Sequence, residues 1–246
     1  MPALLLAVFL AMLDAQVVAT ALPRVVDDLG GLSEFAWVTT GYLIASTVST
    51  PLYGKLGDLF GRKKMFLLAI ALFLAGSAAC ALAPSMPVLI ACRVLQGAGA
   101  GGLFVSVLAI VGELFTPREG ARYYGWFSLC FAVSALAGPL VGGVLTDLFG
   151  WRSVFGVNLP LGAVAVFAVA RLLHLEHRER RAKLDWAGLF LLSGAITAAT
   201  LLAAWAGSRL GWNSPVVLGL GAAVVVLTGA FVLAERRAGA AAAAVR

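Results

Sequence analysis

Long apolar runs separated by short charged segments dominate this sequence of 246 residues. Hydrophobic residues make up 61% of the chain and charged residues 12%, and the mean hydropathy is +0.98. Soluble domains are nearer half apolar and a quarter charged, whereas about 20 apolar residues suffice for a helix to cross a bilayer. We therefore predict an all-α polytopic membrane protein with eight spans, at about residues 3–22, 35–56, 65–83, 86–110, 123–146, 153–173, 186–206 and 216–234.

The basic residues are distributed unequally between the two ends of these spans. One face has only Arg24, Arg152 and Arg209. Because cytoplasmic loops are enriched in Lys and Arg, we predict that the richer face and both termini are cytoplasmic, in the cell's inner (plasma) membrane. The net charge of +6 lies in these loops and forms no patch with interleaved aromatics, so nucleic acid is not an expected partner. The richer face has Lys55, Arg62, Lys63, Lys64, Arg118, Arg122, Arg171, Arg178, Arg180, Arg181, Lys183, Arg236, Arg237 and Arg246.

The connection between the second and third spans reads Gly-Lys-Leu-Gly-Asp-Leu-Phe-Gly-Arg-Lys-Lys, from Gly54 to Lys64. Gly57 and Gly61 permit the backbone conformations of a tight turn, and Asp58 can be held by a helix N-terminus or a neighbouring Arg. An ordinary cytoplasmic loop with turn glycines is the plainer interpretation. In the other interpretation, this segment and the cytoplasmic turn between the fourth and fifth spans form an ion-pair cluster that latches one conformation. The residues of this latch would be Gly54, Asp58, Gly61, Arg62, Lys63, Glu113 and Arg122.

Two ionisable side chains lie well inside predicted spans, Asp14 in the first and Arg93 in the fourth. Asp14 is about eight residues, or roughly 12 Å, from the outer end of its span, and Arg93 is about seven residues, or roughly 10 Å, from the outer end of its own. They are therefore expected to pair if the two spans are neighbours. An intramembrane acid is a functional candidate by default. The alternatives are that Asp14 only fixes helix packing and that Arg93 snorkels to the outer surface.

Small residues and proline mark the fourth and fifth spans. Four glycines after Arg93 would let a neighbouring helix or a substrate approach the backbone closely, at positions 97, 99, 101 and 102. In the fifth span Pro139 favours a kink, and Gly138 and Gly142 form a small-xxx-small face next to Gly143. A kinked and closely packed helix suits a change between two packings. Asn158, in the sixth span, is a polar group that needs a partner helix.

These motifs together resemble the major facilitator superfamily of secondary transporters. The Gly54–Lys64 segment is similar to its cytoplasmic signature loop, and the segment from Arg93 is similar to its span-four motif Arg-x-x-Gln-Gly-x-Gly. Residues 13–23 look like the span-one signature of the fourteen-helix drug/proton antiporters (EmrB/QacA type), although Gln16 and Ala19 replace the usual Thr and Asn. Residues 134–143 resemble the antiporter motif Gly-x-x-x-Gly-Pro-x-x-Gly-Gly with Ser134 first, and residues 151–162 resemble Trp-Arg-x-x-Phe-x-x-Asn-x-Pro-x-Gly of the same branch.

The resemblance implies a proton-coupled antiporter that exports small hydrophobic or cationic compounds, such as drugs, by alternating access. Asp14 and Arg93 would handle the proton, and the proton gradient would supply the energy without any cofactor. Gln16, Gln96 and Asn158 would line the substrate cavity. The expected partners are the lipid bilayer, protons and the exported compound.

The expected organisation follows from the same resemblance. Residues 1–173 would form the amino-terminal six-helix bundle, 174–185 a cytoplasmic linker, 186–234 two extra transmembrane helices and 235–246 a cytoplasmic tail. The carboxy-terminal bundle is not in this sequence, so the chain is expected to be about half a transporter. The alternative is a truncated, transport-incompetent half or a non-catalytic membrane subunit.

An enzyme is disfavoured, because both histidines lie in the linker and no span carries a Gly-x-Ser-Gly nucleophile site or a protease acid pair. A metal site is not expected either. The linker pair His174 and His177, with Glu176 between them, has metal-ligand character, but one pair in a basic linker more commonly has no such role.

Overall fold

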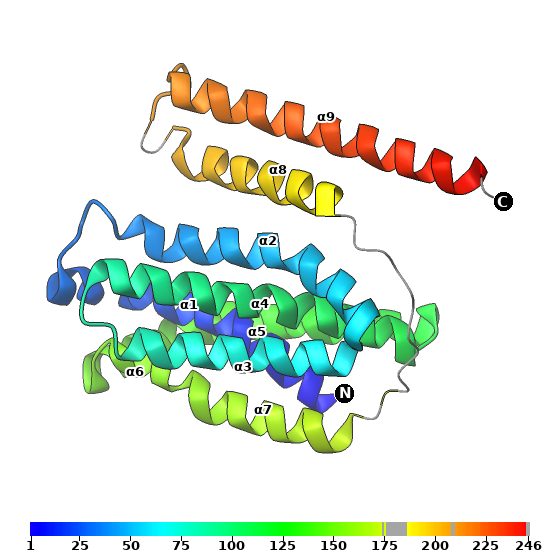
Figure 1. Ribbon diagram of the computed structural model, residues 1–246. Helices are drawn as coiled ribbons and strands as arrows, with labels where there is room; N and C mark the ends of the chain where they lie inside the picture. Colours follow the sequence, from blue (N-terminus) through cyan, green and yellow to red (C-terminus); the bar gives the residue numbers. More distant parts are fainter. Residues whose placement is uncertain (174, 176–185, 208–209, 245–246) are drawn as a thin grey trace. The chain divides into compact units, whose positions relative to one another are not determined.

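The structure, a computed structural model, describes residues 1–173, 175, 186–207 and 210–244, and the regular elements of these residues are helices (Figure 1). Apart from residue 175, the predicted linker and its histidine pair lie outside the described residues. The chain divides into two units, α1–α7 and α8–α9. The helices are α1 (Pro2–Leu29), α2 (Ala36–Phe60), α3 (Arg62–Ala81), α4 (Met86–Leu114), α5 (Pro117–Phe149), α6 (Arg152–Gly156), α7 (Asn158–Leu172), α8 (Trp186–Trp205) and α9 (Pro215–Ala244).

Each predicted span corresponds to a helix, and the sixth consists of α6 and α7, which are separated only by Val157. By length and composition, 7 helices in the described part of the chain are apolar enough to cross a membrane, with α6 and α7 counted as one. The remaining helix, α2, is long enough but carries many hydroxyl groups. Several of these bond to carbonyl oxygens of their own helix, as Thr47 does to Leu43 at 2.6 Å and Thr50 to Ser46 at 2.8 Å.

Several helices extend beyond the predicted spans, and α1 and α9 extend furthest at one end. α1 continues past Pro23 to Leu29 and ends where Gly30, at a φ of 70°, donates its N–H to the Val26 carbonyl at 2.9 Å. A positive φ is accessible to glycine at little cost, so Gly30 is a suitable helix terminator. α9 runs to Ala244, through most of the residues assigned to a tail, because alanine is the best helix former.

Helix α4 lies between α2 and α3, and its glycines determine how closely the three helices approach (Figure 1). A Cβ atom on Gly97 would lie 2.9 Å from the Tyr42 Cα of α2. A Cβ atom on Gly99 would lie 2.8 Å from the Ala69 carbonyl oxygen of α3. These backbones can be in contact only where α4 has no side chain.

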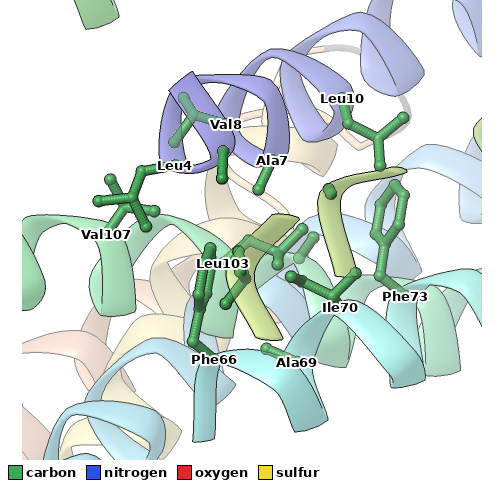
Figure 2. Packing of buried hydrophobic residues seen from close by; sticks show 14 of the residues in the cluster. Leu4, Ala7, Val8, Leu10, Phe66, Ala69, Ile70, Phe73, Leu103 and Val107 are labelled. Atoms are coloured by element: carbon green, nitrogen blue, oxygen red, sulfur yellow. The ribbon is translucent and has the colours of Figure 1, made fainter. Parts of the chain in front are cut away.

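The bundle core is formed by apolar side chains of α1, α3 and α4 (Figure 2). Figure 2 shows Leu10 of α1 close to Phe73 of α3, with Leu4, Phe66 and Leu103 in the same cluster. All five are at most 1% exposed. A second cluster, around Trp151 and Phe155, fills the predicted outer half of the bundle. In the other unit, α8 and α9 pack against each other, with Gly194 facing Leu227.

Candidate functional site

An ion pair between Asp14 of α1 and Arg93 of α4 lies inside the bundle. The Arg93 Nη1 atom is 2.7 Å from the Asp14 Oδ2 atom, and each residue is 1% exposed. The contact expected from their similar depth is therefore present. The alternative of a snorkelling Arg93 is wrong for this structure, because the guanidinium is buried against Asp14 instead of reaching the surface.

Two neutral amides complete the hydrogen bonding of this pair. Asp14 Oδ1 accepts from Gln96 Nε2 at 2.8 Å and from Asn158 Nδ2 at 2.6 Å. The same Arg93 Nη1 atom also donates to Gln96 Oε1 at 2.8 Å. A buried carboxylate is tolerated when a cation and hydrogen-bond donors surround it, which is the case here.

The guanidinium of Arg93 is enclosed by aromatic rings and backbone. Its central carbon lies 4.0 Å from the Tyr42 ring centroid and 5.8 Å from that of Phe155. Its Nε donates to the Val38 carbonyl at 3.4 Å. Cations over aromatic faces are stabilised by the ring quadrupole, so α2 contributes to holding the charge.

The polar contacts continue from Asn158 to the break between α6 and α7. Asn158 Nδ2 donates to Ser77 Oγ of α3 at 2.9 Å, and Ser77 Oγ donates to the Phe155 carbonyl at 2.9 Å. Ser77 is fully buried. We name Asp14, Arg93, Gln96, Asn158 and Ser77 the Asp14 network.

A cavity of about 250 Å³ lies beside this network, between α1, α2, α4 and α5. Gln16 and Ser46 are the polar uncharged side chains of its wall, and Tyr42 belongs both to this wall and to the Arg93 contacts. Gln96 and Asn158, which were assigned to a substrate cavity together with Gln16, are instead buried in the Asp14 network. The remaining lining is Val8, Ala11, Met12, Ala15, Ala100, Phe104 and Phe131.

Arg62 connects the ends of three helices. The turn between α2 and α3 is the single residue Gly61, at a φ of 95°, so Arg62 starts α3 next to Asp58. The guanidinium lies 3.1 Å from Asp58 and 3.4 Å from Glu113 of α4, and it donates to the Ala109 carbonyl. A cation is favourable at a helix C-terminus, which here is that of α4.

The other proposed latch residues differ in their contacts. Lys63 Nζ donates to the Ala170 carbonyl of α7 at 2.9 Å. Arg122 is exposed and makes no ion pair within the described residues. The cation that contacts both Asp58 and Glu113 is Arg62. Arg122 lies on the first turns of α5. A Cβ atom on Gly54 would make an ordinary contact, 3.8 Å from Val105.

The glycine and proline motif of α5 faces α1. A Cβ atom on Gly142 would lie 2.8 Å from the Val17 carbonyl oxygen, and one on Gly138 would overlap Gln16. Pro139 is inside α5, and a Cβ atom on Gly143 would meet nothing within 4 Å. The small residues at 138 and 142 therefore allow close packing with the helix that carries Asp14.

At the predicted outer end, ion pairs connect α1 to α5 and α6. Arg24 lies 3.3 Å from Asp147, and Arg152 lies 2.9 Å from Asp28, which also accepts from Trp151 Nε1 at 2.9 Å. Trp151 is buried, and its ring also packs edge-on against Phe155.

Sequence reasoning missed Tyr42 and Ser77. Neither has a signal along the chain, since a lone tyrosine or serine is common in membrane helices.

In the part of the chain that the structure describes, no group of three His, Cys, Asp or Glu side chains is placed so that it could hold a metal ion.

Comparisons with known proteins identify the family of this polytopic helical bundle. Residues 4–233 match the sequence pattern of the Major Facilitator Superfamily, and the chain belongs to this family. It is 37% identical over 235 residues to Multidrug resistance protein 3 of Bacillus subtilis, covering 96% of this chain and 46% of that protein. It is 39% identical over 237 residues to Efflux pump dotC of Dothistroma septosporum, covering 93% of this chain and 41% of that protein.

Solved structures agree on the fold. The human organic anion transporter MFSD10 has a TM-score of 0.67 at 16% identity, covering 89% of this chain and 58% of that chain. The POT family transporter PepTSo has a TM-score of 0.66 at 17% identity, covering 94% of this chain and 52% of that chain. The chain thus spans about half the length of the curated relatives that it matches.

Proposed function

We propose that this chain is the amino-terminal part of a proton-coupled antiporter that exports small hydrophobic or cationic compounds across the cytoplasmic membrane. The observation that carries this proposal is the buried Asp14–Arg93 pair beside a cavity. A carboxylate that exchanges a proton needs a site shielded from lipid and a partner for its charged form. Arg93 is that partner, and the cavity that Gln16 lines is a place for the transported compound.

Export is supported by the relatives, which are named as a multidrug resistance protein and an efflux pump. The fourteen-helix branch is supported by α8 and α9, two long apolar helices that follow the six-span bundle. These names give no support to the alternative of a non-transporting subunit. The cavity wall supports hydrophobic cargo, because Met12, Phe104 and Phe131 supply much of its surface.

In the proposed cycle, a proton from the outer side binds Asp14 and weakens its attraction to Arg93. The exported compound leaves, the two bundles rock to the other packing, and the proton is released inside. Gly138, Pro139 and Gly142 keep α5 close to α1 during this change. The contacts of Arg62 with α2 and α4 stabilise one of the two packings at the cytoplasmic end.

This latch role predicts a difference between two arginines. Arg62→Gln removes contacts with Asp58, Glu113 and the Ala109 carbonyl. In proteoliposomes of the full-length transporter with an imposed pH gradient, efflux of a fluorescent cation such as ethidium should therefore fall several-fold. Arg122→Gln removes the same charge from an exposed position and should leave efflux near that of the unchanged protein. Equal rates for the two variants would contradict the latch role of Arg62.

The orientation is tested by labelling. In a background with Cys80, Cys92 and Cys130 replaced by Ala, a cysteine introduced by Lys64→Cys should react with a membrane-impermeant maleimide only after the cells are opened. Lys64 is exposed next to Arg62, and its charge should keep this loop in the cytoplasm. Leu32→Cys is the matched control, because Leu32 is 72% exposed at the opposite end and should react in intact cells. The reverse labelling pattern would refute the proposed topology.

A further inference from the structure

One oxygen atom of the Asp14 network has no hydrogen-bond partner among the described residues. It is Oδ1 of Asn158, which is buried together with the rest of its side chain. A primary amide has two N–H donors and one acceptor oxygen. Asn158 uses its nitrogen for Asp14 Oδ1 and Ser77 Oγ, and only the oxygen remains unused.

The neighbours of Asn158 fix its amide in this orientation. An ionised Asp14 can only accept hydrogen bonds, and the single hydrogen of the Ser77 hydroxyl is given to the Phe155 carbonyl. Both neighbours therefore require the Asn158 nitrogen. Gln96 differs, because its oxygen already accepts from Arg93 at 2.8 Å and would lose that contact on rotation.

We propose that Asn158 is the positioning residue that responds to the protonation state of Asp14, a role that rests on the proposed proton coupling. While Asp14 is ionised, the Asn158 amide donates to it. When a proton from water binds Asp14 Oδ1, that atom becomes a donor, the Asn158 amide rotates, and its free oxygen accepts the new O–H. Arg93 keeps all its hydrogens, so the charge of the Asp14–Arg93 pair changes from zero to +1.

The rotation has a consequence for Ser77. After it, the Asn158 oxygen offers Ser77 an acceptor, so the hydroxyl hydrogen can leave the Phe155 carbonyl. Phe155 lies in α6 two residues before the break at Val157, and α7 starts at Asn158 itself. The protonation state of Asp14 in α1 is thereby connected to the break between α6 and α7.

Other ionisable groups surround Asp14, and the substitutions of the test leave these residues unchanged. They are Arg93 of α4, Tyr42 of α2 and Cys80 of α3, all of which interact electrostatically with Asp14 or with each other. Asn158 itself is neutral, so its replacement changes no charge.

The test is infrared difference spectroscopy of the purified protein in lipid nanodiscs during a pH titration. The protonated carboxyl band that Asp14→Asn removes is assigned to Asp14. Asn158→Leu, of similar volume, removes the oxygen that would accept the new O–H of Asp14. The Asp14 band should therefore shift to the higher frequency of a carboxyl group that donates no hydrogen bond.

Ser134→Ala is the matched control, since the Ser134 hydroxyl is equally buried, also lacks a partner and belongs to α5. It should leave the frequency of the Asp14 band unchanged. Asn158→Ser, which is shorter but polar, serves if Asn158→Leu does not yield folded protein. If the Asp14 band keeps its frequency in the Asn158 variant, or shifts equally in Ser134→Ala, the role of Asn158 is overturned while the proposed proton coupling stands. The absence of any Asp14 band over the titration would instead overturn the proposed proton coupling.

Discussion

Asp14→Asn is expected to reduce proton-driven efflux to the level of empty liposomes while the protein still inserts into the membrane. Asparagine keeps the shape of the side chain but cannot take up and release a proton. It also offers a single acceptor oxygen, whereas Asp14 accepts from Arg93 on Oδ2 and from Gln96 on Oδ1. The measurement is ethidium efflux from proteoliposomes of the full-length transporter after a pH jump, with insertion checked by surface labelling and fluorescence-detected size exclusion.

The variant also leaves the buried Arg93 charge unpaired. Removing one partner of a buried ion pair lowers the free energy of unfolding by about 3–5 kcal/mol, so lost transport has to be separated from lost folding. The double variant Asp14→Asn, Arg93→Gln removes both charges and should regain thermal stability without regaining efflux. If the double variant transports, the role of Asp14 is structural.

A second acid on α1 serves as the matched control. Asp27 is exposed near the end of the helix and makes no ion pair within the described residues. Asp27→Asn makes the same chemical change outside the bundle and should leave the efflux rate within about twofold, since exposed charges contribute little. A comparable loss in both variants would contradict a special role for Asp14.

Gly99→Ala is expected to cause a large loss of stability, because α4 is in backbone contact with α3 at this position. The added Cβ atom would lie 2.8 Å from both the Ala69 carbonyl oxygen and the Phe73 Cα, which are backbone atoms and cannot rotate away. Separating α3 from α4 to admit it should lower the free energy of unfolding by about 1–3 kcal/mol or more. Thermal unfolding followed by size exclusion in detergent measures this effect.

Gly112→Ala provides the comparison on the same helix. A Cβ atom at Gly112 meets nothing within 4 Å, so this change should be neutral or stabilising by up to about 1 kcal/mol through helix propensity. Equal melting temperatures for the two variants would mean that α3 and α4 are not in backbone contact at Gly99.

Much of the fold could be predicted from the sequence because membrane-spanning helices are specified locally. Every predicted span is helical, and the turn at Gly61 is as tight as its glycines suggested. The errors have local causes. Pro23 did not end α1, since the helix continues to Gly30, and Val157 divides the sixth span into α6 and α7.

The candidate site was only partly predictable. Asp14 and Arg93 were recognisable because an ionisable residue is rare inside a membrane span. Gln96 and Asn158 were identified as polar residues inside spans but assigned to the cavity wall. Ser77 and Tyr42 were not identified, since their importance depends on which side chains face them.

The sequence by itself determined the class of fold and the two charged residues of the site, because hydropathy and a charge inside an apolar run are properties of one segment at a time. The tertiary structure decided that Asp14 meets Arg93, that Asn158 joins them from α7, and that Arg62 rather than Arg122 contacts Glu113. These contacts join helices far apart in the sequence. They depend on helix rotation and on the close approach that glycine permits, which no single segment encodes.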